Sequence, residues 1–360
     1  MLKAVACAFF LAAAGFISLL TQLAAEPGNG RALMLAPILR DAAISADDEN
    51  TTDPDTQPAT AFRTTVRHLF DEEKFDQLDE IAGEVRAQKS RFRGGYWKLH
   101  YFYGALEEPG SLTAVDAAWE AHFERLQRWI ASHPDSITPR VALAAAYLRF
   151  AWKARGSGYA NKVVAEGWKA FRERVQKAQE VLEEARSLPA KDPEWYRAMQ
   201  TVALAQGWDH KRAEQLLAEA NGVEPGYYYF DEAHANYLLP KWYGKPGDAE
   251  EFARTVADRI GGADGDSTYF MVASSLNCCR KQAEAPGISW DRVKEGFASL
   301  EQLYGSTNYE RNALAFMALR QGDREFAQQL FARIGDNWNK RVWGSKDRFE
   351  SGKASLSQGP

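Results

Sequence analysis

Apolar residues recur every three or four positions along most of the chain from about Phe62 onward, with polar residues between them. This spacing places the apolar groups on one face of a helix. The apolar runs are roughly 12–20 residues long and are separated by Gly or Pro. No stretch shows the alternation and the richness in Val, Ile and Thr that are typical of a half-buried strand. The pattern therefore predicts an all-α protein.

Three of the apolar runs end at a glycine. They are 252–260 before Gly261, 293–304 before Gly305 and 326–334 before Gly335. Glycine adopts the left-handed conformation that ends many helices without steric cost. Two of the runs begin after Gly-Asp, and we expect Asp248 and Asp323 to cap the free amides of the first helical turn.

The runs are also spaced like helical repeats. Pro193 and Pro225 lie 32 residues apart and each precedes a Tyr-rich run, a distance close to the period of about 34 residues in tetratricopeptide repeats. Other spacings drift from about 30 to about 44 residues, and the full consensus of that repeat is absent. We therefore predict an irregular tetratricopeptide-like helix-pair solenoid over residues 62–350.

The first 25 residues have the features of an export segment. Lys3 is followed by residues 4–25, which carry no charge. Such a run is typical of a signal peptide, but it is nearly long enough to span a bilayer as a membrane anchor, and both interpretations stay open. The protein is thus expected to be exported, either periplasmic or anchored to the inner membrane facing the periplasm. Residues 26–61 and 351–360 are polar and are expected to form a disordered linker and a disordered tail.

Composition narrows the classes of partner. The formal net charge is −5 and no basic run is present, so binding to nucleic acid is not expected. Eleven Trp, 14 Tyr and 19 Phe are spread along the chain, a distribution that favours core packing over a surface for stacking ligands. Beyond the export segment only Cys278 and Cys279 remain, and as neighbours they indicate neither a disulfide framework nor a metal site.

Sequence motifs of catalysis are missing. The chain has no GxxxxGK[ST], HExxH or GxSxG, and its six histidines show no i,i+4 pair. We therefore name no catalytic residue, no metal ligand and no cofactor. Acidic pairs such as Glu250-Glu251 are abundant, and two carboxylates facing each other across a groove would suit a hydrolase acting on cell-wall glycan or peptide. Whether the protein is an enzyme stays open.

Two segments interrupt the helical pattern and carry candidate binding residues. In WKARGSGYA at 152–160, Arg155 lies between Trp152 and Tyr159, where a guanidinium can stack on aromatic rings or bind a carboxylate. The alternative is a tight turn whose arginine pairs with a neighbouring acid. In LLPKWYGKPGD at 238–248, prolines and glycines predict a loop that displays Trp242 and Tyr243. The alternative is that these rings fold back over the end of a helix pair.

A third candidate for binding is Tyr228, in the middle of the Tyr-rich run that follows Pro225. Together with the two loop segments it completes the set of residues expected to contact a partner: Trp152, Arg155, Tyr159, Tyr228, Trp242 and Tyr243.

Several Trp and Gly clusters, taken in order, resemble a known family. They are FDQL at 75–78, RFRGGYWKL at 91–99, WKARGSGYA at 152–160, DPEWY at 192–196 and LLPKWYGKPGD at 238–248. Over most of residues 65–345 the chain is similar to the bacterial family labelled domain of unknown function 4034. The resemblance implies a tetratricopeptide-like helical domain, and it supplies no catalytic residue.

From the helical array, the linker and the missing motifs we predict a non-enzymatic scaffold of the bacterial cell envelope. Its concave face would bind a protein or peptide partner. The alternatives are an envelope hydrolase with carboxylates in the groove, and a structural spacer without a pocket.

Overall fold

The structure is a computed structural model that describes residues 54–156, 162–277 and 287–357. Over these residues it consists of α-helices, one 3-10 helix and an isolated bridge between Arg91 and Trp97, without a β-strand. The predicted all-α class is therefore confirmed. The export segment, residues 26–53 of the linker, Tyr159 and the two neighbouring cysteines lie outside the described residues.

The helices follow one another with short connections. Their bounds are α2 (Gln57–Asp71), α3 (Phe75–Gln88), η1 (Arg93–Gly95), α4 (Lys98–Gly104), α5 (Asp116–Ser132), α6 (Thr138–Arg155), α7 (Ala165–Ala185), α8 (Pro193–Gln206), α9 (His210–Val223), α10 (Tyr229–Tyr237), α11 (Asp248–Ile260), α12 (Gly262–Asn277), α13 (Trp290–Tyr304), α14 (Asn308–Gln321), α15 (Arg324–Ile334), α16 (Lys340–Trp343) and α17 (Lys346–Ser355). None of the described helices is both long and apolar enough to cross a membrane.

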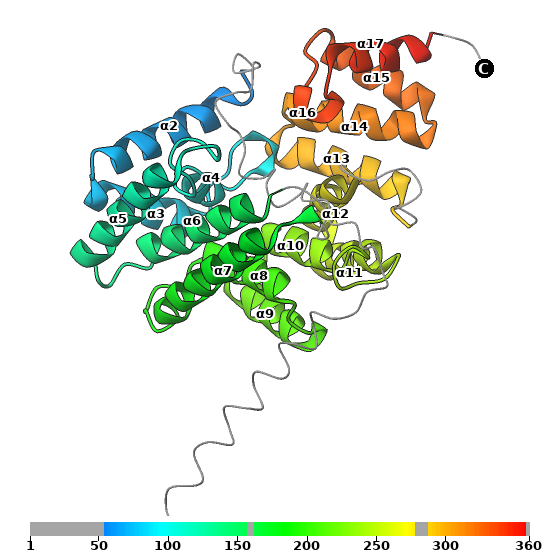
Figure 1. The fold of residues 1–360 in the computed structure, drawn as a ribbon. Coiled ribbons are helices and arrows are strands. Elements are labelled where there is room, and N and C mark those ends of the chain that lie inside the picture. The colour runs from blue at the N-terminus through cyan, green and yellow to red at the C-terminus, as the bar shows by residue number, and fades with distance from the viewer. Residues whose placement is uncertain (1–53, 157–161, 278–286, 358–360) are drawn as a thin grey trace, which may run out of the picture.

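Most helices pack against their neighbours in sequence, as in the pairs α6–α7, α11–α12, α12–α13 and α14–α15. The chain passes from α2–α6 through α7–α9 to α10–α12 and ends in α13–α17 (Figure 1). The short helix α10 breaks the regularity, because it packs against α8, α9, α11 and α12. The solenoid-like arrangement is thus confirmed and irregular, while its relation to tetratricopeptide repeats stays a prediction.

Local sequence explains where the helices begin and end. Gly261, Gly305 and Gly335 follow α11, α13 and α15, and their φ values of 72°, 72° and 60° are positive, as predicted for glycine at a helix end. Their ψ values of 165°, 163° and −122° lie outside the left-handed helical region that was expected. Asp323 caps α15 by accepting a hydrogen bond from the amide of Phe326, also as predicted.

The expected role of Asp248 is wrong. Gly247 is the N-cap of α11, and the Asp248 carboxylate accepts a hydrogen bond from the amide of Lys245 in the preceding turn. The two prolines and two glycines of this loop turn the chain so that the carboxylate faces backward, away from the first amides of the helix.

Both predicted boundaries of the array shift outward. Helix α2 begins at Gln57, five residues before the expected start of the helical domain. At the other end, α17 continues to Ser355 and Leu356 is buried, so the tail predicted to be disordered from residue 351 is helical to residue 355. The apolar contacts of Phe349 and Leu356 hold this polar stretch on the array.

The aromatic residues fill the core, as their distribution predicts. The largest fully buried side chains include Trp97, Trp119, Trp129 and Trp343. They pack ring against ring, for example Trp119 on Phe150 with centroids 4.8 Å apart. Burying rings of this size supplies much of the apolar area that stabilises the helix pairs.

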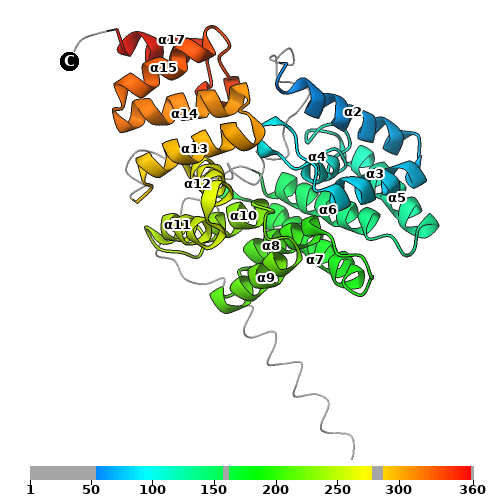
Figure 2. The same ribbon diagram turned by 180° about the vertical axis from the view of Figure 1, so that it is seen from behind.

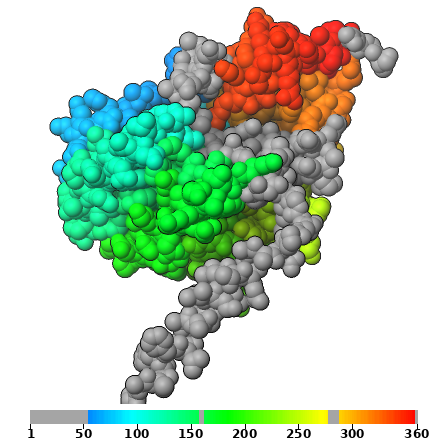
Figure 3. All heavy atoms as spheres, in the orientation of Figure 1, coloured from blue at the N-terminus to red at the C-terminus, as the bar shows by residue number. Residues whose placement is uncertain are grey.

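The array curls until its first part touches its last part. The amide of Gly94 donates to the carbonyl of Gly305 at 3.0 Å, and Arg93 donates through Nε to the carbonyl of Ser306 at 2.6 Å. Figure 2 shows the same approach of η1 to α13 from behind, and in the space-filling view the start and end of the array share the upper side (Figure 3).

Two buried or half-buried polar pairs add to this closure. Tyr96 donates its hydroxyl to Glu310, and Arg311 forms an ion pair of 2.6 Å with Asp55. We refer to the contacts between residues 55–96 and residues 304–311 as the seam. Because of the seam, the described array is closed on itself.

Candidate functional site

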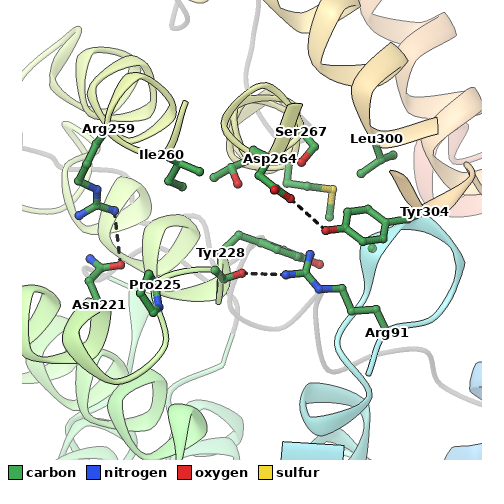
Figure 4. A pocket seen from close by; sticks show the side chains of 14 residues that line it. Arg91, Asn221, Pro225, Tyr228, Arg259, Ile260, Asp264, Ser267, Leu300 and Tyr304 are labelled. Carbon is green, nitrogen blue, oxygen red and sulfur yellow. Dashed lines mark hydrogen bonds between the residues drawn. The ribbon is translucent and has the colours of Figure 1, made fainter. Parts of the chain in front are cut away.

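A cavity of about 540 Å³ lies beside the seam. Its walls come from four parts of the chain that are distant in sequence: the segment around η1, the connection from α9 to α10, the end of α11 with α12, and α13. The volume is within the range of about 300–1,000 Å³ that is usual for ligand pockets. Figure 4 shows the guanidinium of Arg91 reaching toward the centre of the lining, whereas Arg259 points to Asn221 and Asp264 points to Tyr304.

Arg91 forms one side of the cavity. Its guanidinium carbon lies 4.3 Å from the centroid of the Trp97 ring and 4.8 Å from that of the Tyr304 ring. One nitrogen donates to the carbonyl of Gly226 at 3.3 Å. Contacts with two aromatic rings favour a planar cation and fix its orientation before any ligand arrives. Arg91 is therefore a preorganised cation at the cavity wall.

Arg259 faces the cavity from the opposite side, at the end of α11 (Figure 4). Its Nη2 donates to Oδ1 of Asn221 at 3.4 Å and lies 3.6 Å from Oδ1 of Asp231, while the Arg259 side chain remains 48% exposed. Asp231 is fully buried, and no described residue donates a hydrogen bond to either of its oxygens. Burial raises the pKa of Asp231 to about 7, against the opposing effect of Arg259.

The remaining wall combines one carboxylate with apolar groups. Tyr304 donates its hydroxyl to Asp264 at 3.2 Å, which draws the carboxylate toward α13. Ile260, Met271 and Leu300 supply the apolar surface. A site with an apolar surface and a few oriented charges suits the binding of an amphipathic ligand.

A buried polar network holds the loop that carries Pro225 and Tyr228. Glu194 accepts the hydroxyl of Tyr227 and lies 2.7 Å from Nδ1 of His100. Burial by itself raises the pKa of Glu194, but the charges of His100 and Arg197 and these hydrogen bonds outweigh it, so the pKa lies below its ordinary value. A carboxylate kept ionised in the interior anchors the loop firmly.

Among the predicted binding residues, Tyr228 lines this cavity, and its side chain is 4% exposed. Trp152 and Trp242 meet elsewhere, with centroids 6.1 Å apart in an edge-to-face contact. The structure thus brings together the two segments that the sequence singled out, but inside the core.

The loop residues Trp242 and Tyr243 are not displayed to solvent as expected. Trp242 is 9% exposed, and Tyr243 donates its hydroxyl to the carbonyl of Leu204 at 2.9 Å. Tyr243 folds back onto α8 and Trp242 packs against Trp152 of α6, which is the second possibility given for this loop, because the Pro and Gly turns direct the chain inward.

Arg155 is buried at 4% exposed, with its guanidinium carbon 5.5 Å from the Trp152 ring centroid and 5.2 Å from that of Trp168. Burial lowers its pKa. The predicted stacking is therefore present, with Trp168 as the second ring, while Tyr159 lies outside the described residues. That any of these core residues binds a partner stays a prediction.

Arg91, Arg259, Asp264 and Tyr304 are not among the residues predicted from the sequence to bind a partner. The available signal was the density of arginine, glycine and aromatic residues in 91–99, which indicated only a family resemblance. Within the described part of the chain, no group of three or more His, Cys, Asp and Glu side chains is placed to hold a metal ion. The cavity therefore offers charge and shape as its means of recognition.

Residues 62–206 match the family model described as Domain of unknown function (DUF4034). The predicted resemblance is confirmed over this stretch, which covers the first part of the array through the end of α8 and includes Arg91. Arg259 and Tyr304 lie beyond the match, so the cavity is built from residues inside and outside the matched region. No curated protein matches the chain.

Proposed function

We propose that this protein is a non-enzymatic scaffold that binds a peptide or an extended protein segment in the cavity beside the seam. The observation that carries the proposal is the convergence of four separate parts of the chain on one cavity with preoriented cationic and apolar walls. A structural spacer has no need of such a cavity. Helical arrays commonly use their inner surface for recognition.

The chemistry of the walls favours a peptide over a purely apolar or purely charged ligand. The apolar groups of Ile260, Met271 and Leu300 suit side chains, while Arg91 and Arg259 suit acidic groups. The carbonyl of Gly226 already accepts from Arg91, so the backbone at this position helps to orient the cation.

The competing function, a hydrolase of envelope material, has less support. A hydrolase of this kind uses two carboxylates facing each other across the substrate. Among the described lining residues, Asp264 is the one carboxylate. Asp231 has a raised pKa, but it is buried behind Arg259. Binding is therefore the function that we propose.

The cellular setting is part of the same proposal. The charge-free run of residues 4–25 supports export of the chain to the bacterial envelope, with the array facing the periplasm. Under this proposal the partner is a peptide or protein segment that is present outside the cytoplasm.

The test is selection of peptides from a random phage-displayed library on the full chain, followed by calorimetry. We expect selected peptides to bind in the micromolar range, about 1–100 μM. Ile260→Trp places an indole in the cavity and should weaken binding about tenfold or more. Leu303→Trp is the matched control, because Leu303 is 40% exposed on α13 and does not line the cavity.

Helicity and melting temperature of both variants should match those of the parent chain. A library that yields no binder, or peptides that bind Ile260→Trp as tightly as the parent, would remove the basis of the proposal.

A further inference from the structure

We infer that the cavity recognises a carboxylate group of its peptide, and that Arg91 is the residue that binds this group. The inference rests on the proposed function and specifies the ligand chemistry of the same site. It follows from the contacts of the Arg91 side chain, from the charges around it, and from the seam, which brings Tyr304 into contact with it.

The Arg91 guanidinium has two aromatic contacts and donates one hydrogen bond to the described chain. Trp97 and Tyr304 contact the guanidinium, and Gly226 accepts one hydrogen bond from it. A guanidinium has five N–H donors. Among the described residues, no carboxylate forms an ion pair with Arg91. An oriented donor edge beside a cavity matches the two oxygens of a carboxylate.

Other arginines of the array show what a structural arginine looks like in this protein. Arg86 lies 2.6 Å from an oxygen of Asp192, and Arg149 donates to Glu108 at 3.0 Å. None of these four residues lines the cavity. Arg91 is oriented by two aromatic rings but has no carboxylate partner of this kind within the described chain. A carboxylate of a ligand would supply that partner.

The charges of the lining also favour an anion. Among the described lining residues Asp264 is the one carboxylate beside Arg91 and Arg259, and the buried Asp231 lies 3.6 Å from Arg259 behind the wall. Arg91 is therefore the lining arginine whose charge no carboxylate of the described chain pairs with at close range. Asp264 accepts the Tyr304 hydroxyl, which satisfies part of its hydrogen-bonding capacity. A cationic group of a ligand would be repelled by the two arginines, whereas a carboxylate would be attracted and could accept their hydrogen bonds.

The carboxylate site exists only when the seam is closed. Tyr304 belongs to α13, whereas Arg91 precedes η1. Gly95, with a φ of 75°, lies so close that a Cβ would be 3.0 Å from Cδ2 of Tyr304. Opening the seam would take one aromatic ring away from Arg91. Binding of the carboxylate and closure of the array should therefore stabilise each other.

A peptide has two sources of this group, its C-terminus and an acidic side chain. The experiment uses the peptides selected on the full chain, each synthesised as the free acid and as the C-terminal amide. A third form is the amide with every Asp and Glu changed to Asn and Gln. The affinity of each form for the full chain is measured by calorimetry.

We expect the third form to bind at least about tenfold more weakly than the free acid, because charge-assisted hydrogen bonds are lost. If the C-terminal amide already binds as weakly as the third form, the C-terminal carboxylate is the group that is recognised. If the amide binds as tightly as the free acid and only the third form binds weakly, the group is an acidic side chain. If all three forms bind equally, the carboxylate inference is wrong and the proposed function stands. If none of the three forms binds, both are wrong.

Variants assign the interaction to Arg91. Arg91→Gln should reduce the difference between the free acid and the third form to less than about twofold, and Arg91→Lys should retain only part of it. Arg212→Gln is the matched control: Arg212 also stacks on an aromatic ring, 3.2 Å from the Trp208 centroid, but does not line the cavity. An unchanged difference in folded Arg91→Gln or Arg91→Lys would overturn the assignment.

Discussion

In the described part of the chain, two arginines each contact a pair of aromatic rings, and they lie in opposite surroundings. Arg155 lies over Trp152 and Trp168, and it is 4% exposed within the core. Arg91 lies over Trp97 and Tyr304, at closer distances of 4.3 and 4.8 Å, and it borders a cavity. The local chemistry is the same, but only the second of these two arginines lines the cavity.

The difference comes from how far apart the contacting residues are in sequence. Arg155 and its two rings come from α6 and α7, which are consecutive and pack along their lengths. Tyr304 follows Arg91 by 213 positions and reaches it only because the array closes. A local cluster of this kind becomes part of a helix pair, whereas a cluster that forms across the seam creates new surface.

The strongest test of this comparison is Trp152→Ala. Trp152 is 2% exposed and packs against Phe171, with centroids 4.8 Å apart, and against Trp242. Truncation in a core of this kind should lower the free energy of unfolding by about 3–5 kcal/mol, as judged by urea unfolding. Peptide affinity of the folded fraction should stay unchanged.

Trp208→Ala is the matched control for this substitution. Trp208 is half-buried and stacked by Arg212, so its truncation should cost about 1 kcal/mol. If Trp152→Ala instead weakened binding and left stability intact, the segment at 152–160 would be a binding surface after all.

The second test uses Asp231, the buried group behind Arg259. Its pKa in the folded chain is about 7, whereas a carboxyl of the unfolded chain titrates near 4. Between these values the folded state holds a proton that the unfolded state has released. Stability should therefore fall as pH rises from about 4 to about 7, by about 1 kcal/mol per pH unit, and level off above that.

Asp231→Asn replaces the carboxyl with a neutral group of similar size. The variant should be more stable than the parent by about 4 kcal/mol at pH 8 and nearly equal at pH 4, measured by urea unfolding at both values. Asp258→Asn is the control, since that side chain is 62% exposed in its pair with Arg292. Parallel pH profiles of the parent and Asp231→Asn would show that Asp231 does not titrate in this range.

The sequence predicted the parts of this protein that depend on near neighbours. Periodicity identified the helices, and Gly261, Gly305 and Gly335 marked three of their ends because the positive φ at these positions is a local requirement that glycine meets. The predicted capping role of Asp248 was wrong, because the direction of that carboxylate depends on the turn before it. The expected tail from residue 351 failed because α17 is held by tertiary contacts of Phe349 and Leu356.

The candidate site was harder to predict for the same physical reason. Tyr228 lines the cavity as a predicted binding residue, but Trp242 was expected on the surface and is buried. A rare aromatic cluster can cover a helix end or form a ligand wall, and only its neighbours in space distinguish the two. For Arg91 those neighbours include Tyr304 of α13. The periodicity of the sequence predicts that α13 is a helix, but it does not predict that α13 lies beside η1.

The smallest effect that we expect concerns the seam. Tyr96→Phe removes the hydroxyl that donates to Glu310 and leaves the ring in place. Burial raises the pKa of Glu310, and its contacts with Thr307 and Tyr96 oppose this effect. Since Glu310 keeps its hydrogen bonds from Thr307 in the capping box of α14, the loss in unfolding free energy should be about 1–2 kcal/mol.

The location of the loss matters more than its size. If the seam builds the Arg91 site, Tyr96→Phe should weaken peptide binding and speed hydrogen exchange of the Gly94 amide, which donates to Gly305 across the seam. Tyr196→Phe is the control, because Tyr196 packs beside Trp195 on α8, far from the seam in sequence. Tyr96→Phe could instead lower stability and leave both peptide binding and hydrogen exchange at Gly94 unchanged. In that case the seam would contribute to packing without shaping the Arg91 site, and Arg91 and Arg155 would differ only in their exposure to solvent.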